Sequence, residues 1–335
     1  MVGNDEVDVA RAANHPPFEP ELAAILDFYP PRLRATVTPE TIGVYREAIR
    51  NREPTLAELT ASGAVEAEVR DVAGPDGSPD VRILILRKVG GSQRPRPCLF
   101  HIHGGGMIAG DSLMRADSLS QSVFELDVVG ISVQYRLAPE HPFPAGLEDC
   151  YAALIWVSKH AAELNIDLGR IITQGASAGA NLALATALLA RDRGGPAISH
   201  QILQCPMLDD RTSIDRPVGE TAELVWDHVS NATAWNSLLG GTAGGPGVSE
   251  FAAPARMTDL SGLSNTYIDV GQADTFRDEV IDFAARLAAS DVLVEFHLWP
   301  GAWHGFDYIA PYAALSQLSN DTRRAFLSRA IGPAN

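Results

Sequence analysis

Apolar, β-rich runs alternate with segments of helical periodicity along the chain from about Ala64 onward. Apolar strands that are separated by helices are typical of a largely parallel sheet with both faces covered. The sequence therefore predicts an α/β fold. The predicted strands are Val81–Leu86, Pro97–Ile102, Val128–Gln134, Arg170–Thr173, Gln201–Gln204, Thr266–Val270 and Val292–Leu298, and the clearest predicted helices are Leu147–His160 and Ala178–Arg191.

The charge balance argues against two classes of partner. The 335 residues carry a formal net charge of -16, and both nucleic acids and anionic membranes repel such a chain. The acidic start MVGNDEVDVA lacks a signal pattern, and the most apolar run, Ala178–Ala190, is too short to span a bilayer. Cys98, Cys150 and Cys205 stand far apart, which favours buried thiols over disulfides or a metal site. We expect a cytoplasmic protein without stable membrane association or a nucleic-acid partner.

The sequence Gly175-Ala176-Ser177-Ala178-Gly179 stands between a predicted strand and a predicted helix. A serine on such a tight turn has a strained backbone, so the residues two positions away must be glycine or nearly as small. The N-terminus of the following helix offers free N–H groups to a developing oxyanion. A lone G-x-S-x-G pattern is common in loops, but this strand-to-helix context is typical of a nucleophile elbow. The pattern predicts Ser177 as a nucleophile.

A second motif, His103-Gly104-Gly105-Gly106, directly follows the predicted strand that ends at Ile102. Consecutive glycines let backbone N–H groups face inward, and the tetrahedral intermediate of acyl transfer needs such donors. Losing one donor of this kind typically costs about 3–4 kcal/mol of transition-state stabilisation. A flexible glycine turn is the alternative interpretation. We interpret His103 as a structural residue whose ring supports the loop.

These two motifs, with YRLAPEHPFPA (Tyr135–Ala145) between them, resemble the hormone-sensitive-lipase family of esterases, also called bacterial family IV. The resemblance runs from roughly Pro95 to Phe306. It implies the α/β-hydrolase fold, with a mostly parallel central sheet, helices on both faces and a helical cap. It also implies an oxyanion hole made by the N–H groups of three residues, Gly105, Gly106 and Ala178.

The chain departs from this family at two positions beside the nucleophile. The family usually has an acidic or hydroxyl residue before the serine and a glycine at the end of the motif, as in GDSAGG. Ala176 and Ala180 occupy those positions here. We therefore expect one hydrogen bond that helps to hold the elbow to be absent, while nucleophilic chemistry at Ser177 remains possible.

The triad of an α/β hydrolase follows the order Ser, Asp or Glu, His along the chain. Asp274 lies just past the strand Thr266–Val270 and resembles the acid of the family; Asp278 is the alternative. Asp278 and Glu279 fall in the first turn of the next helix, where negative charge is favourable. His304, in PGAWHGF past the last predicted strand, matches the HGF segment of the family. The competing histidines lie in strand, helical, cap or proline-rich contexts: His141, His160, His228 and His297.

Together these residues predict a serine hydrolase that cleaves carboxylic esters with short- to medium-chain acyl groups. Ser177 attacks the carbonyl, His304 takes its proton, Asp274 orients the ring, and water hydrolyses the acyl-enzyme. This chemistry requires neither a metal nor an organic cofactor. Two alternatives remain. One is an amidase or a deacetylase of a small acetylated metabolite; the other is a non-catalytic small-molecule receptor, since gibberellin receptors resemble this family but lack the catalytic histidine.

Two segments interrupt the strand-helix alternation. Residues 1–60 combine a proline-rich start with a helical stretch around Glu40–Arg52, and Asp209–Arg256 carries Trp226, Trp235 and the glycine-rich GGTAGGPG. We expect an N-terminal cap segment over residues 1–60 and a catalytic domain over residues 61–335, with a second cap insertion at about 209–256. A tail is the alternative for the first segment. The resemblance also implies a possible homodimer through the last strand, Val292–Leu298.

Overall fold

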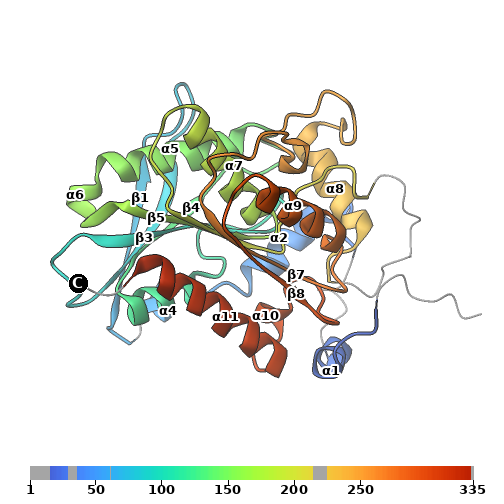
Figure 1. Ribbon diagram of the computed structural model, residues 1–335, viewed down its shortest axis with the longest axis horizontal. Coiled ribbons are helices and arrows are strands. Elements are labelled where there is room, and N and C mark those ends of the chain that lie inside the picture. The colour runs from blue at the N-terminus through green and yellow to red at the C-terminus, as the bar shows by residue number, and fades with distance from the viewer. Residues whose placement is uncertain (1–15, 29–35, 61, 214–224, 333–335) are drawn as a thin grey trace, which may run out of the picture.

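An eight-stranded sheet forms the centre of the computed structural model, which describes residues 16–28, 36–60, 62–213 and 225–332 (Figure 1). The strand order is β1-β2-β4-β3-β5-β6-β7-β8. Among these eight strands, β2 runs antiparallel to both of its neighbours, and the other pairs are parallel. The strands are β1 (Val65–Val72), β2 (Val81–Lys88), β3 (Arg96–Ile102), β4 (Val129–Gln134), β5 (Ile166–Ala176), β6 (His200–Gln204), β7 (Asn265–Gly271) and β8 (Val294–Trp299).

Helices cover both faces of the sheet because its strands are apolar on both sides. In β2, Ile83 and Ile85 belong to one core cluster, while Leu84 and Leu86 belong to the cluster on the opposite face. The first cluster includes side chains of α5 (Ala145–Lys159), α6 (Ala161–Leu164), α7 (Ala178–Asp192) and α9 (Arg277–Ala289). The second includes side chains of α3 (Leu56–Thr60), α4 (Ala116–Leu126) and α11 (Ala314–Ile331). The predicted α/β-hydrolase architecture is confirmed.

The sequence-based strands all exist, with bounds that differ from the prediction by up to four residues. β1 was not predicted: its sequence VEAEVRDV alternates apolar and charged residues, because it is an edge strand with one wet face. β5 begins at Ile166, before the predicted start at Arg170, and β8 begins at Val294. β8 lies at the other edge of the sheet, with Phe296 and Leu298 partly exposed. Homodimer pairing through this strand stays a prediction.

The most apolar run of the sequence forms α7, a 15-residue core helix. The residues of α7 from Ala178 to Ala190 are all buried, which explains why they are apolar on every side. In the described part of the chain, none of the helices has the length and apolarity needed to cross a membrane.

The N-terminal segment places its two main helices at different sites. α1 (Pro20–Phe28) packs beside the loop after β8: Leu22 shares a buried cluster with Trp303, and the Glu19 N–H donates to the Gly301 carbonyl at 3.0 Å. A Cβ on Gly301 would lie 2.5 Å from the Glu19 nitrogen, so this close approach requires glycine. α2 (Ile42–Arg50) follows a 3₁₀ turn, η2 (Pro39–Thr41). It contacts the segments around Ile108 and Ala138 instead of the loop after β8.

Arg46 of α2 fastens this helix to the YRLAPEHPFPA loop. Its guanidinium donates to both carboxylate oxygens of Glu140 at 2.7 Å and to the Ala138 carbonyl at 2.9 Å. Its Nε donates to the Ile108 carbonyl at 2.6 Å. The long motif that the sequence analysis singled out therefore supplies a docking place for α2, next to the HGGG segment.

The second predicted insertion contains α8 (His228–Leu239) and the 3₁₀ turn η3 (Pro254–Arg256), and its residues 214–224 lie outside the described residues. Glu279 of α9 binds the start of this insertion. Its buried carboxylate accepts from the Leu208 N–H at 2.6 Å and from the Thr212 hydroxyl. Burial raises the pKa of Glu279 to about 8. A short helix, α10 (Phe306–Ile309), follows the HGF segment and leads into α11.

Candidate active site

Ser177 occupies the sharp turn between β5 and α7. Its backbone has φ 58° and ψ −124°, a strained conformation for any residue with a Cβ. A Cβ on Gly175 would lie 2.3 Å from the Gly179 carbonyl, and a Cβ on Gly179 would lie 2.1 Å from the Ile102 carbonyl. The two glycines of the motif are therefore required by space, as the sequence predicted.

Backbone bonds from the end of β6 hold this turn. The Ser177 N–H donates to the Gln204 carbonyl at 2.8 Å, and the Ser177 carbonyl accepts from the Met207 N–H at 3.2 Å. These bonds involve no side chain at position 176, where the chain departs from the family pattern. The alanine there is buried and lines the cavity in front of the serine.

Three predicted residues from distant parts of the chain meet above this turn. The His304 Nε2 lies 3.1 Å from the Ser177 Oγ, and its Nδ1 lies 2.9 Å from the Asp274 Oδ2. A carboxylate only accepts, so Nδ1 carries the proton and leaves Nε2 to accept from the serine hydroxyl. Asp274 has a fully buried side chain, and its Oδ1 accepts from the Phe276 N–H at 2.9 Å. The arrangement is that of a nucleophile, a base and an orienting acid.

The alternative residues lie elsewhere. Asp278 lies in the first turn of α9, is 64% exposed and pairs with Arg277 at 2.6 Å, so Asp274 is the carboxylate beside His304. Three of the competing histidines have other partners: the Trp156 carbonyl for His160, the Ser213 hydroxyl for His228 and the Glu295 carboxylate for His297.

The HGGG segment opens the glycine loop, residues 103–110, which faces Ser177. Gly105 (φ 96°) and Gly106 (φ 65°) need the freedom of glycine, because a Cβ on Gly105 would lie 2.3 Å from the Ala109 carbonyl. Within the described residues, no hydrogen bond uses the N–H of Gly105 or Gly106. Ala178 is the first residue of α7, where a helix leaves its N–H groups free. Gly105 and Gly106 line the same cavity as Ser177, and Ala178 follows the serine directly, while the oxyanion hole made by these three residues stays a prediction.

His103 and Tyr135 brace the glycine loop from behind. The two rings stack with centroids 4.1 Å apart, and the Tyr135 hydroxyl donates to the His103 carbonyl at 3.0 Å. The His103 Nδ1 lies 2.9 Å from the Gly104 carbonyl. Burial lowers the pKa of His103 to about 4, so the ring stays neutral at physiological pH. The interpretation of His103 as a structural residue agrees with these contacts.

A cavity of about 130 Å³ opens in front of Ser177. Both predicted cap segments contribute to its walls, Tyr45 and Ile49 from α2 and Trp226 from the insertion. Trp235 instead is fully buried in the core, so only one of the two tryptophans noted in the sequence faces the site. The other lining residues come from the glycine loop, from Met114 and Arg115 before α4, from the serine turn, from Cys205 after β6 and from the segment that begins at His304.

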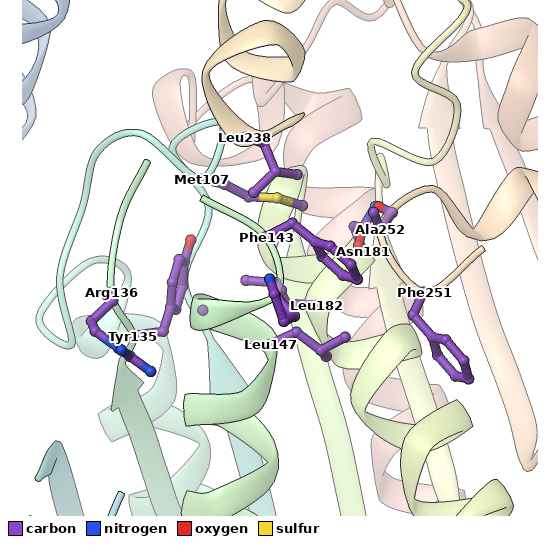
Figure 2. Close-up of a pocket in the computed structure, with 12 residues that line it drawn as sticks. Met107, Tyr135, Arg136, Phe143, Leu147, Asn181, Leu182, Leu238, Phe251 and Ala252 are labelled. Atoms are coloured by element: carbon purple, nitrogen blue, oxygen red, sulfur yellow. The ribbon is translucent and has the colours of Figure 1, made fainter. Parts of the chain in front are cut away.

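A separate crevice lies between the glycine loop, α5, α7 and α8 (Figure 2). Its free volume is only about 10 Å³, which is about the space for one water molecule. It therefore cannot hold an ester, and the cavity above Ser177 is the candidate substrate site. Figure 2 shows the mostly apolar lining of the separate crevice, which includes Met107, Phe143, Leu147, Leu182, Leu238 and Phe251.

Cys205 is a site residue that the sequence analysis did not single out. Its sulfur and the ligand atoms of Asp274 and His304 all lie within 4.8 Å of one another, a spacing that suits a metal ion. Both His304 nitrogens are already hydrogen-bonded, to Asp274 and to Ser177, so neither is left to bind a metal. Burial also raises the pKa of the Cys205 thiol, which disfavours the thiolate that metals prefer. These side chains suit proton transfer better than metal binding.

The environment of His304 predicts a pH dependence. Burial by itself would lower its pKa, but the neighbouring Asp274 carboxylate and, after it, the Cys205 side chain outweigh burial and raise the pKa well above the ordinary 6.5. Only the neutral ring accepts the serine proton, so kcat/KM should rise with pH through a midpoint above 6.5. The measurement is kcat/KM for an uncharged ester across pH, with circular dichroism to show that the protein is folded at each point. A profile that is flat through this range would contradict a histidine base.

Comparisons with known proteins agree with this geometry. A family model described as the α/β hydrolase fold matches residues 99–308. Esterase LipI of Mycobacterium tuberculosis is 32% identical over 92% of this chain and 94% of its own. Carboxylesterase NlhH of the same species is 33% identical over 92% and 94%. Hormone-sensitive lipase of Mus musculus is 34% identical over 56% of this chain and 24% of its own.

A solved structure, a bacterial heroin esterase, shares 34% sequence identity with a TM-score of 0.83, over 95% of this chain and 99% of that one. Because the two chains align over nearly their whole lengths, the structural similarity includes the segments that lie outside residues 99–308 as well as the sheet. The chain therefore belongs to the α/β-hydrolase family, in the group of esterases that resemble hormone-sensitive lipase.

Proposed function

We propose that this protein is a serine carboxylesterase that hydrolyses short- to medium-chain acyl esters. The observation that carries the proposal is the hydrogen-bond chain from Ser177 through His304 to Asp274, beside unused N–H donors of the glycine loop. The names of the relatives, esterase and carboxylesterase, support the choice of an ester bond.

The mechanism follows from the positions of these groups. His304 takes the hydroxyl proton as the Ser177 Oγ attacks the ester carbonyl, and Asp274 stabilises the imidazolium that forms. The N–H groups of Gly105, Gly106 and Ala178 stabilise the negative oxygen of the tetrahedral intermediate. His304 then gives its proton to the departing alcohol. Water attacks the acyl-enzyme by the same route and releases the acid.

The size and the walls of the cavity support short acyl groups. Its volume of about 130 Å³ is smaller than the roughly 300–1,000 Å³ that small-molecule pockets commonly have. Tyr45, Ile49 and Trp226 give it an apolar side that suits a hydrocarbon chain of a few carbons.

The test is the rate of hydrolysis of 4-nitrophenyl esters from acetate to dodecanoate. We expect the highest kcat/KM at the short end of the series and a fall of about tenfold or more towards dodecanoate. The matching anilides measure amidase activity, and a fluorophosphonate label on Ser177 separates an enzyme from a receptor. Faster cleavage of anilides, a maximum at the longest chains or the absence of labelling would each contradict the proposal.

A further inference from the structure

The cavity above Ser177 ends at two stacked side chains, Arg115 and Tyr308. The Arg115 guanidinium lies 4.8 Å from the centre of the Tyr308 ring. Both residues line the cavity of the serine, and both also line a second cavity of about 300 Å³. The pair is therefore a wall with one cavity on each side.

The second cavity has a different character from the first. It lies beside α4, α10 and α11, and most of the residues that line it are polar or charged. They include Ser118, Gln121, Gln174, Gln204, Asp307, Asn320 and Arg323. An ester group that passed the wall would find more than twice the space of the first cavity, in polar surroundings.

Arg115 is firmly held in this wall. Its side chain is only 11% exposed, and it donates to the Asp307 carboxylate at 3.0 Å and to the Gln204 side-chain carbonyl at 3.1 Å. Asp307 also accepts from Arg323 at 3.1 Å. An incoming hydrocarbon chain would have to separate a buried ion pair to move the guanidinium, and buried charges that lose their partner are costly. Because Asp307 already neutralises Arg115, the positive charge of Arg115 is poorly placed to attract an anionic substrate.

We propose that Arg115, stacked on Tyr308, sets the upper size of the ester group that this enzyme accepts by closing the serine cavity from the polar cavity behind it. The inference rests on the proposed esterase function and names the residue that limits its substrate. Arg115 is a specificity-determining residue in this proposal, since its contacts are to the wall and not to the reacting atoms.

The ion pair with Asp307 also connects Arg115 to the catalytic base, because Asp307 lies three residues after His304 in the same segment. Loss of the ion pair therefore affects turnover on every substrate, whereas loss of the wall affects only large substrates. The ratio of kcat/KM between a long and a short ester separates the two effects. Arg115→Met is the matched control, because it keeps most of the length and bulk but breaks the ion pair as Arg115→Ala does.

The experiment measures kcat/KM for two ester series, one varied in the acyl chain and one in the alcohol. In Arg115→Ala we expect the ratio of kcat/KM for the eight-carbon ester to kcat/KM for the two-carbon ester to rise by about tenfold or more. The rise should occur in the acyl series, the alcohol series or both. Arg115→Met should stay close to the wild-type ratio. Tyr308→Ala removes the other side chain of the wall. It should raise the same ratio of kcat/KM in the same series. This variant keeps the test valid if Arg115→Ala folds poorly.

Three outcomes overturn the inference while the proposed function stands. Unchanged ratios in both wall variants would show that the wall does not limit size, and equal shifts in Arg115→Ala and Arg115→Met would assign the effect to the charge. A loss of kcat shared by all substrates with no change of ratio would leave Arg115 only as a support for the His304 segment. A wild-type protein that cleaves no ester in either series would instead refute the proposed function, and the inference would fall with it.

Discussion

Ser177→Ala is expected to lower kcat for ester hydrolysis by roughly a million-fold while the protein stays folded, since the loss of a triad nucleophile has that effect elsewhere. The hydroxyl is the atom that His304 faces at 3.1 Å, and the methyl group of alanine offers no replacement for it. Alanine also keeps the Cβ that this turn already tolerates at φ 58°, so the change adds no backbone strain.

The measurement is turnover of 4-nitrophenyl acetate by purified variant, with thermal unfolding followed by circular dichroism. Ser328→Ala is a suitable control, because Ser328 is an exposed serine of α11 that only bonds the Arg324 carbonyl. A Ser177→Ala enzyme that kept more than about one per cent of wild-type turnover, after contamination is excluded, would remove Ser177 as the nucleophile.

Asp274→Asn should reduce kcat by about 10⁴, the size of the same change in a serine protease. Asparagine keeps the shape and can still accept from the Phe276 N–H, but it supplies no charge for the imidazolium and no longer fixes the correct ring tautomer. Asp278→Asn is the matched control four residues away. Its carboxylate is exposed and pairs with Arg277, and an exposed pair contributes at most about 1 kcal/mol to stability. Comparable losses in the two variants would rule out Asp274 as the orienting acid.

The parts of the site that sequence predicts well are those fixed by local backbone geometry. Ser177 needs glycine two residues away on each side, and the glycine loop needs residues without a Cβ, so both leave short, readable motifs. Asp274 and His304 follow because each comes just after a strand, and the ends of parallel strands meet at one edge of the sheet.

The rest of the site depends on contacts between residues that are far apart in the chain. Arg115, Gln204 and Asp307 form one network, yet no motif surrounds Arg115 or Gln204, and nothing in the sequence connects either residue with Asp307. Cys205 and Trp226 also reach the site only through the packing of whole elements. The same holds for β1, because its charged face hides the strand from a search for continuous apolar runs.

The packing of α1 against the loop after β8 has a consequence for when the enzyme becomes active during its synthesis. Leu22 shares a cluster with Trp303, and the Ala314 N–H donates to the Glu21 carboxylate at 2.7 Å. The segment that carries the base is thus anchored by residues that come far earlier in the chain. Because synthesis runs from the N-terminus to the C-terminus, Ser177 is made before Asp274 and His304, and the triad is complete only once His304 has been added. We expect premature hydrolysis during synthesis to be prevented by this order of assembly alone.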